Sequence, residues 1–396
     1  MSKVRISKKT IYWFVACLSF LLIAFLLLLV RNGLTRDQIT QQMADRWSET
    51  SDVAQISMFF TKDAGMTKSR IVGLEHALDS ALQEASITVE SENPGARLWA
   101  DAYSANGKLM VSTDRASMNL TAIGVGGDFF QFHPLDLEYG NFFSDKDLNH
   151  DYVVIDEEIA WQLFGGINVP GKVINVNGAP HVIAGVIRRP KGKPETAAGL
   201  GDPIIYVSME TLEKYAGATI LDHFEIVMPN PIKGFAMNML KENLMLDERE
   251  VEYVENTTRF SLEASLKVME QFGFRSMHGK AIIYPYWENL ARRCEDILAF
   301  VSLFMVLFFA VPAIIVFVWL IYRWKHKKWT FRSVTKKLSE LAGRMVRRSK
   351  THGAMTKESR KKESRKKESQ VKKAGKRESR TPIRIDFNEE EKNEKE

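Results

Sequence analysis

Two long apolar stretches lie near the ends of the chain, and neither contains a charged residue. The first runs from Ile11 to Val30 and the second from Ile297 to Tyr322. Because an α-helix rises about 1.5 Å per residue, a run of about 20 residues spans the 30 Å hydrocarbon core of a bilayer. Each stretch therefore predicts a transmembrane helix, and Pro312 predicts a bend in the second.

The first stretch has an alternative interpretation as a cleaved signal peptide, because basic residues precede it. A signal peptide has a shorter apolar core, of about 7 to 15 residues, and small residues at its cleavage site. Here the run is longer and ends in the sequence Val30-Arg31-Asn32-Gly33. The sequence therefore favours an uncleaved membrane anchor.

Basic residues flank both apolar stretches on the side of the chain ends. Residues 1–10 hold four Lys or Arg and no acid, and residues 323–396 hold 26 basic and 11 acidic residues. Positively charged flanks stay on the cytoplasmic side of a membrane. We therefore expect a plasma (inner) membrane protein with both ends in the cytoplasm, spans at 11–30 and 297–322, and an extracytoplasmic domain at 31–296.

The two ends of this domain share a pattern of strands and helices. Residues 53–60 form an apolar run typical of a strand, and residues 67–84 have the period of a helix. Four apolar positions share one face of that helix: Ile71, Leu74, Leu78 and Leu82. Near the other end, strand patterns surround a helical pattern at 233–246, so we expect one α/β lobe built from both ends.

The centre of the domain, about 97–190, has short alternating runs broken by turn residues, which is typical of β structure. Asn106-Gly107 and Asn177-Gly178 each lie between two such runs, and Asn-Gly is a strong signal for a tight hairpin turn. One short helix is expected at 157–164. The predicted fold class is α+β, with a mostly β lobe inserted into the α/β lobe.

Motifs for catalysis and cofactor binding are weak. Gly166 to Val173 satisfies G-x-x-x-x-G-K, but Val173 replaces the Ser or Thr that would reach magnesium, and a strand pattern follows instead of a helix. The histidines outside the spans lack metalloprotease spacing: His76, His133, His150, His181, His223 and His278. We expect each to be a surface or hydrogen-bonded polar residue, and we expect no catalytic residue, no metal and no cofactor.

An acidic run offers one alternative to this expectation. Asp145, Asp147, Asn149 and Asp151 alternate as the ligands of a calcium loop do. The run lacks the glycine and the distal glutamate of such a loop, so a solvated turn is the favoured interpretation.

The two cysteines lie at the membrane. Cys17 is inside the first span and Cys294 is at the entrance to the second, so the expected domain has no pair for an internal disulfide. Its stability must come from its core, which its size allows.

The C-terminal tail has low complexity. Residues 357–369 repeat a short charged unit, and such a composition cannot bury enough apolar surface to fold alone, so we expect a disordered tail. Its charge favours either anionic lipid headgroups or RNA. Lipid contact is expected nearest the membrane, at Lys325, Lys327, Lys328 and Arg332.

Three ordered segments of the centre resemble the MacB-like periplasmic core domain of MacB and FtsX-type ABC transporter permeases. They run from 125 to 143, from 151 to 166 and from 171 to 190. The residues that carry the likeness are Phe129, Phe130, Gly140, Ala160, Leu163, Phe164, Gly171, Gly185 and Val186. These are core and turn residue types, so the resemblance implies a fold and supplies no catalytic site.

The resemblance also implies a function. It suggests a shortened, non-catalytic membrane subunit that pairs with a separate ABC ATPase and permease, its outer domain contacting a substrate or partner. A homo-oligomer is a further expectation. Such permeases usually have three more spans after the domain, whereas this chain has one.

The competing hypothesis is a two-span sensor or adaptor, because many receptors share this layout. A receptor of this kind would act through a recruited cytoplasmic partner, since only the basic tail follows the second span.

Overall fold

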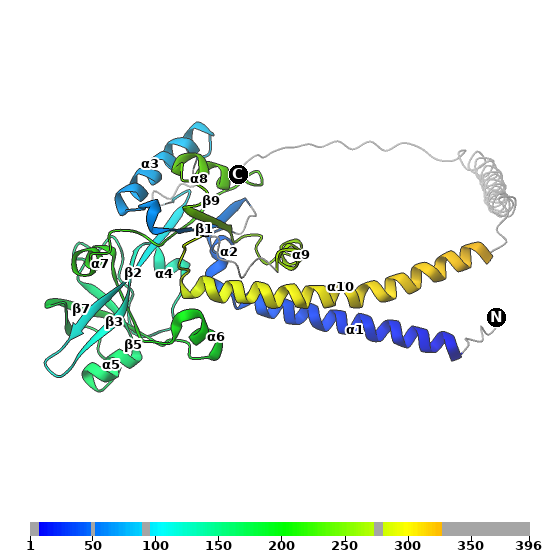
Figure 1. The fold of residues 1–396 in the computed structure, drawn as a ribbon, viewed down its shortest axis with the longest axis horizontal. Helices are drawn as coiled ribbons and strands as arrows, with labels where there is room; N and C mark the ends of the chain where they lie inside the picture. Colours follow the sequence, from blue (N-terminus) through cyan, green and yellow to red (C-terminus); the bar gives the residue numbers. More distant parts are fainter. Residues whose placement is uncertain (1–7, 49–51, 89–95, 273–279, 327–396) are drawn as a thin grey trace, which may run out of the picture. The chain divides into compact units, whose positions relative to one another are not determined.

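The computed structural model describes residues 8–48, 52–88, 96–272 and 280–326. Two helices, α1 (Lys8–Arg36) and α10 (Tyr286–His326), are long and apolar enough to cross a membrane by length and composition. They run side by side away from the sheet (Figure 1), and the rings of Phe20 and Phe308 lie 5.7 Å apart between their centroids. The apolar stretches predicted at 11–30 and 297–322 are therefore both helical.

The domain between these helices combines ten strands with short helices. The strands are β1 (Val53–Phe60), β2 (Ala100–Ser112), β3 (Ser117–Gly127), β4 (Leu137–Gly140), β5 (Tyr152–Asp156), β6 (Val173–Val176), β7 (Ala179–Ile187), β8 (Ile204–Ser208), β9 (His223–Pro229) and β10 (Val251–Glu255). The helices are α2 (Met43–Trp47), α3 (Lys68–Glu84), α4 (Phe129–Phe132), α5 (Glu157–Phe164), α6 (Lys193–Glu195), α7 (Met209–Ala216), α8 (Phe235–Leu244) and α9 (Leu262–Gln271), with single turns η1 (Ile39–Gln41), η2 (Lys62–Ala64) and η3 (Thr196–Leu200).

All ten strands belong to one sheet. Their order is β10-β1-β9-β2-β3-β8-β5-β7-β4, with β6 paired to β2 and β7. Strand β1 (Val53–Phe60) lies between β9 and β10 and is antiparallel to both, although β9 begins only at His223 and β10 at Val251. The sheet edge formed by these three strands is thus built from both ends of the domain (Figure 1).

The sheet has a buried apolar cluster on each face. One face packs against α3, α5, α7 and α8. The other face packs against α2, α4 and the start of α10, where Trp287 is buried. Side chains alternate along β9, so Phe224 and Ile226 lie in the first cluster and Val227 in the second. The membrane helix α10 therefore docks on the second face.

Most expected elements are confirmed. The strand at 53–60 and the helix at 157–164 have the predicted bounds, and the helix expected at 67–84 spans Lys68–Glu84 with its four predicted apolar residues buried. The α+β class is also confirmed, with two apolar helices flanking a β-rich core. A tight turn at Asn177 and Gly178, with φ of 47° and 89°, joins β6 to β7 as expected.

The hairpin turn predicted at Asn106-Gly107 is wrong. Strand β2 continues through both residues, and its hairpin with β3 turns instead after Thr113, whose N–H donates to the Ala116 carbonyl at 2.8 Å. A Cβ at Gly107 would lie 2.8 Å from Cδ1 of Leu212 on α7. Gly107 is therefore needed for the close packing of α7 on the strand, and it makes no turn.

Candidate functional site at the junction of membrane helices and sheet

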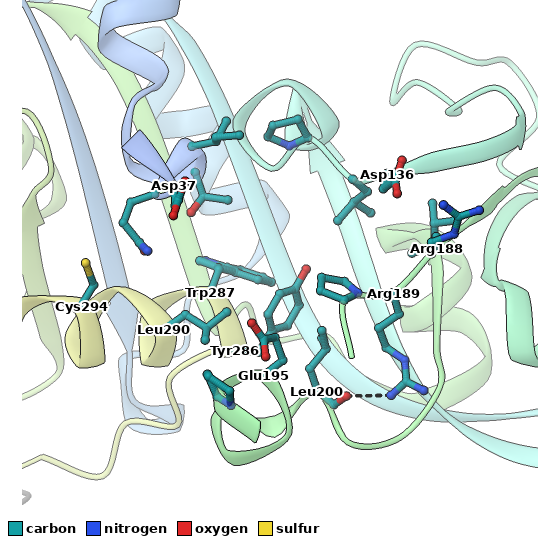
Figure 2. Close-up of a pocket in the computed structure, with 18 of the residues that line it drawn as sticks. Asp37, Asp136, Arg188, Arg189, Glu195, Leu200, Tyr286, Trp287, Leu290 and Cys294 are labelled. Atoms are coloured by element: carbon teal, nitrogen blue, oxygen red, sulfur yellow. Dashed lines mark hydrogen bonds between the residues drawn. The ribbon is translucent and has the colours of Figure 1, made fainter. Parts of the chain in front are cut away.

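A cavity of about 600 Å³ lies where the two membrane helices meet the domain (Figure 2). Its apolar wall comes from the end of α1, the start of α10 and the sheet, and includes Leu34, Ile39, Leu135, Ile187, Leu200, Ile204, Trp287, Leu290 and Ile297. Because these segments are far apart in the chain, the cavity exists only when both membrane helices are docked. Its apolar lining suits an apolar or amphipathic ligand.

Two adjacent arginines at the end of β7 reach this cavity and behave differently. Arg189 is buried, and its Nε donates to Asp156 Oδ2 at 2.8 Å while its Nη1 donates to the Leu200 carbonyl at 2.7 Å. Its charge is thereby compensated, and it holds the segment after η3 in place. The Arg188 side chain is half exposed and pairs with Glu138 at 2.5 Å, so it is the more accessible cation.

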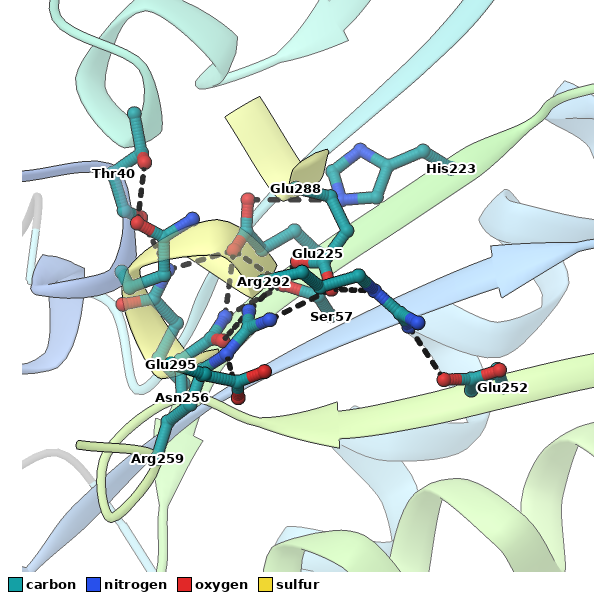
Figure 3. A network of polar contacts seen from close by, with 12 residues as sticks. Thr40, Ser57, His223, Glu225, Glu252, Asn256, Arg259, Glu288, Arg292 and Glu295 are labelled. Carbon is teal, nitrogen blue, oxygen red and sulfur yellow. Dashed lines mark hydrogen bonds and ion pairs between the residues drawn. The ribbon is translucent and has the colours of Figure 1, made fainter. Parts of the chain in front are cut away.

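A buried ion pair joins the start of α10 to the loop after β10 (Figure 3). Arg259 donates from Nη1 and Nη2 to the two oxygens of Glu288 at 2.7 and 2.8 Å, and its Nε donates to Glu295 Oε1 at 2.7 Å. Burial by itself would lower the pKa of Arg259, but the two carboxylates raise it above its usual value. Two parallel hydrogen bonds between one guanidinium and one carboxylate fix the relative orientation of the two side chains as well as their separation.

The network continues from α10 to strand β10. Arg292 donates to Glu288 Oε1 at 2.7 Å and to Glu252 Oε1 at 2.6 Å, and the Tyr284 hydroxyl donates to Glu252 Oε2 at 2.6 Å. Burial raises the pKa of Glu252, but these two donors outweigh it and lower the pKa below its usual value. The first turns of α10 are thus held by charge on both the strand and the loop.

Asn256 connects the ion pairs to the interior of the sheet. Its Oδ1 accepts from Arg259 at 3.2 Å, and its Nδ2 donates to Ser57 Oγ on β1 at 2.7 Å and to Glu225 Oε1 on β9 at 3.2 Å. A continuous set of polar contacts therefore runs from α10 to strands β1 and β9. We call the set formed by Arg259, Glu288, Arg292, Glu252 and Asn256 the junction network.

Sequence reasoning missed the junction network. Its members come from β10, the following loop and α10, so their proximity depends on tertiary structure. One local signal was present: Glu288 and Arg292 are four residues apart immediately before the second apolar stretch, which is the spacing of an ion pair on one helix face.

The nine residues that carried the family resemblance lie in the core or at turns. Phe129 is buried and makes an edge contact with Trp287 of α10 at 5.6 Å, and Phe130 stacks on Phe142 at 4.5 Å. The core around the sheet contains Ala160, Leu163, Phe164 and Val186. Phe129 thus links this set of residues to a membrane helix.

The glycines of this set occupy tight positions. Gly140 and Gly171 both have φ of +82°, in the left-handed region that favours glycine. A Cβ on Gly140 would lie 2.1 Å from the Ala184 carbonyl oxygen, and one on Gly185 would lie 2.6 Å from the Asn141 carbonyl oxygen. Gly140 and Gly185 let β4 approach β7, whereas Gly171 has open space around it and is required by its backbone conformation alone.

The predicted lipid contacts fall mostly beyond the described residues. Lys325 is exposed near the end of α10, whereas Lys327, Lys328 and Arg332 lie outside the described residues, as does the tail from 327 to 396. The contact with anionic lipid stays a prediction.

The histidine expectation is wrong for His223, on β9, which has an exposed fraction of 0% and no hydrogen bond at either ring nitrogen. His133, directly after α4, is 1% exposed and pairs through Nε2 with Glu225 Oε2 at 3.1 Å. With Glu225 they bring one ligand atom each within 4.8 Å of one another.

In the acidic run, by contrast, Asp147 accepts from the Ser144 N–H at 2.9 Å in an exposed loop.

Comparisons with known proteins point to one family. The model of the MacB-like periplasmic core domain matches residues 23–231, which is more than half of the chain. No curated protein matches the sequence.

Three solved structures are among those that match this chain. The extracellular domain of the noncanonic ABC-type transporter YknZ from Gram-positive bacteria is 18% identical, with a TM-score of 0.35, 50% of this chain covered and 99% of that one. The periplasmic region of MacB from Actinobacillus actinomycetemcomitans is 13% identical, with a TM-score of 0.36 and coverages of 57% and 94%. A domain of a putative permease protein from Porphyromonas gingivalis is 15% identical, with a TM-score of 0.29 and coverages of 52% and 89%.

Proposed function

Since the chain belongs to the family of the MacB-like periplasmic core domain, we propose that it is a non-catalytic membrane subunit of an ABC-type transporter. The family supports a transporter-associated membrane protein, and two apolar helices flank its central domain. The proposal places this domain outside the cytoplasm. In the proposed role, the domain at 31–296, with its β lobe at about 97–190, contacts a substrate or partner. A separate ABC ATPase and permease supply the energy and the rest of the pore.

The junction network carries this proposal. A subunit of this kind has to convert movement of its membrane helices into movement of its outer domain. Glu288 and Arg292 lie in the first turns of α10, a few residues before the apolar stretch, and both are ion-paired to the domain. A helix tied in this way cannot rotate or slide without moving the loop after β10, and that loop contacts the sheet through Asn256.

The cavity of Figure 2 gives the proposed subunit a place for a ligand. Its walls come from both membrane helices and from the ends of β5, β7 and β8. Relative movement of the helices would therefore change its volume. The proposal assigns to it an amphipathic molecule, with the apolar part against Leu290 and the polar part near Arg188.

Crosslinking in native membranes tests the role. A chain carrying a C-terminal affinity tag is expressed from its own promoter, crosslinked in intact cells and purified in detergent. We expect an ABC ATPase or a multi-span permease to be recovered with it. A matched chain with Arg259→Met should recover less of the transporter at equal expression, and recovery of no ABC component by the unaltered chain would contradict the proposal.

Cysteine labelling tests the proposed topology independently. In a chain with Cys17→Ser and Cys294→Ser, a cysteine at Leu148, whose exposed fraction is 98%, should react with a membrane-impermeant maleimide applied to spheroplasts. A cysteine at Ser369 in the same background should react only after permeabilisation. The opposite pattern would refute cytoplasmic ends.

A further inference from the structure

Three ligand-type side chains meet inside the domain, on the sheet face that receives α10. His223 and Glu225 alternate with the core residues of β9, so both point to this face, and His133 reaches it from the residue after α4. His133 Nε2 lies 3.1 Å from Glu225 Oε2, and His223 Nε2 lies 3.8 Å from the same oxygen.

These distances between ligand atoms match those between neighbouring ligands of one bound metal ion. Zinc bonds to His nitrogen and carboxylate oxygen are about 2.0 to 2.1 Å long, so two ligands of a tetrahedral zinc are about 3.3 Å apart. The observed 3.1 and 3.8 Å bracket this value, and all three ligand atoms lie within 4.8 Å of one another. A point exists between them that a single cation can occupy.

The imidazoles lack any other partner. Both rings are at least 99% buried; His133 Nε2 and Glu225 Oε2 have only each other, at 3.1 Å, and His133 Nδ1 and both ring nitrogens of His223 make no hydrogen bond. Leaving a buried polar atom unpaired costs about 1 to 3 kcal/mol, so several such atoms at one point are unusual in a folded protein. Coordination of one cation would satisfy both Nε2 atoms and the carboxylate oxygen together.

The carboxylate is already oriented for this role. Glu225 Oε1 accepts from Gln55 Nε2 at 2.7 Å, from Ser57 Oγ at 2.6 Å and from Asn256 Nδ2 at 3.2 Å. These three donors fix the side chain and leave Oε2 turned toward the imidazoles. Hydrogen bonds that hold a carboxylate in this way are typical of protein metal sites.

We propose that His133, His223 and Glu225 bind a divalent transition-metal cation, with zinc as the preferred ion. Two imidazoles and one carboxylate form a ligand set that zinc favours, and the fourth position is left for water or another small ligand.

Trp287 of α10 separates this site from the cavity at the membrane helices. Its ring packs on His133 at 4.3 Å and on His223 at 5.5 Å between centroids, and it also lines the cavity. Since Trp287 is one residue before Glu288, occupancy of the site and docking of α10 are expected to favour each other.

Metal content of the purified full-length chain tests the site. The protein is grown with added zinc, purified in detergent through a tag without histidine, and measured by inductively coupled plasma mass spectrometry. We expect about one zinc ion per chain and a melting temperature that falls when a chelator removes it. Glu225→Gln, His133→Gln and His223→Gln should each reduce zinc to background.

His181→Gln is the matched control, because His181 is also buried but has partners in Thr211 Oγ1 and the Ala179 carbonyl. It should keep the full zinc content. Cobalt added to the wild-type chain should give the visible spectrum of a tetrahedral site without a thiolate charge-transfer band, a readout that holds even if the variants fold poorly. Background zinc in the wild-type chain, or full zinc in all three variants, would overturn the proposal, as would a thiolate band from Cys17 or Cys294.

Discussion

Replacing Arg259 by methionine should destabilise the domain strongly. The change keeps most of the side-chain volume but removes the three donors that face Glu288 and Glu295. Breaking a buried pair by removing one partner costs about 3 to 5 kcal/mol, because the other charge stays buried without compensation. Glu288 keeps one bond from Arg292 Nε at 2.7 Å, so we expect the lower end, about 3 kcal/mol.

Thermal unfolding of the full-length chain in detergent, followed by circular dichroism, measures this cost. For a domain of this size, about 1 kcal/mol shifts the melting temperature by roughly 2 to 4 °C, so Arg259→Met should lower it by about 6 to 12 °C. Adding Glu288→Gln to the same chain should recover about half of the loss, because the unpaired buried carboxylate is then neutral.

The exposed pair of Lys267 and Glu263 provides the control. Its atoms are 2.8 Å apart, yet the two side chains are 66% and 70% exposed. Exposed pairs contribute little, so Lys267→Met should leave the melting temperature unchanged. The reasoning would fail if Arg259→Met and Lys267→Met gave the same melting temperature, or if the double variant lost the sum of both single losses.

Two further predictions concern the sheet. Burial, with Glu75 nearby, raises the pKa of Asp101 from 3.8 to about 8, so the folded state holds a proton between about pH 4 and pH 8 that the unfolded state has released. The free energy of unfolding should therefore fall by up to about 1.4 kcal/mol per pH unit as the pH rises through this window. Asp101→Asn should make the melting temperature nearly independent of pH there, and an unchanged slope of melting temperature against pH would refute this. Gly107→Ala should lower the free energy of unfolding, measured in urea, by about 1 to 3 kcal/mol, because Leu212 packs against both Gly107 and Gly124. A loss near zero would show that Leu212 can move aside.

The elements that the sequence predicted well are those whose signal is local. Helix α3 was found from periodicity, because it buries one face of apolar side chains, and strand β1 was found from a continuous apolar run, because nearly all of its side chains are buried. The turn at Asn177-Gly178 was also found, since left-handed backbone there depends on those two residues alone. The membrane helices needed only length and the absence of charge.

The errors arise where distant parts of the chain decide the structure. Gly107 follows an asparagine, as the glycine of an Asn-Gly turn does. The glycine is required here because Leu212, about 100 residues later in the chain, packs against it. His223 and Glu225 are two residues apart on β9, so alternation along the strand alone places both on one face. His133 joins them only through the position of α4, about 90 residues earlier in the chain, and no spacing within the sequence predicts that contact.

The same long-range contacts explain why charge is buried at the junction. Buried ion pairs add little net stability compared with apolar packing, but they penalise every arrangement that separates the partners. Charged side chains of both membrane helices contact the loop after β10. Arg31 of α1 donates a hydrogen bond to the Phe260 carbonyl, and Glu288 of α10 accepts from Arg259 in an ion pair. A shift of α10 along α1 must therefore break a charged contact or carry the loop with it. Because Asn256 Nδ2 donates to Ser57 Oγ on β1, moving the loop would also displace or break its contact with the sheet.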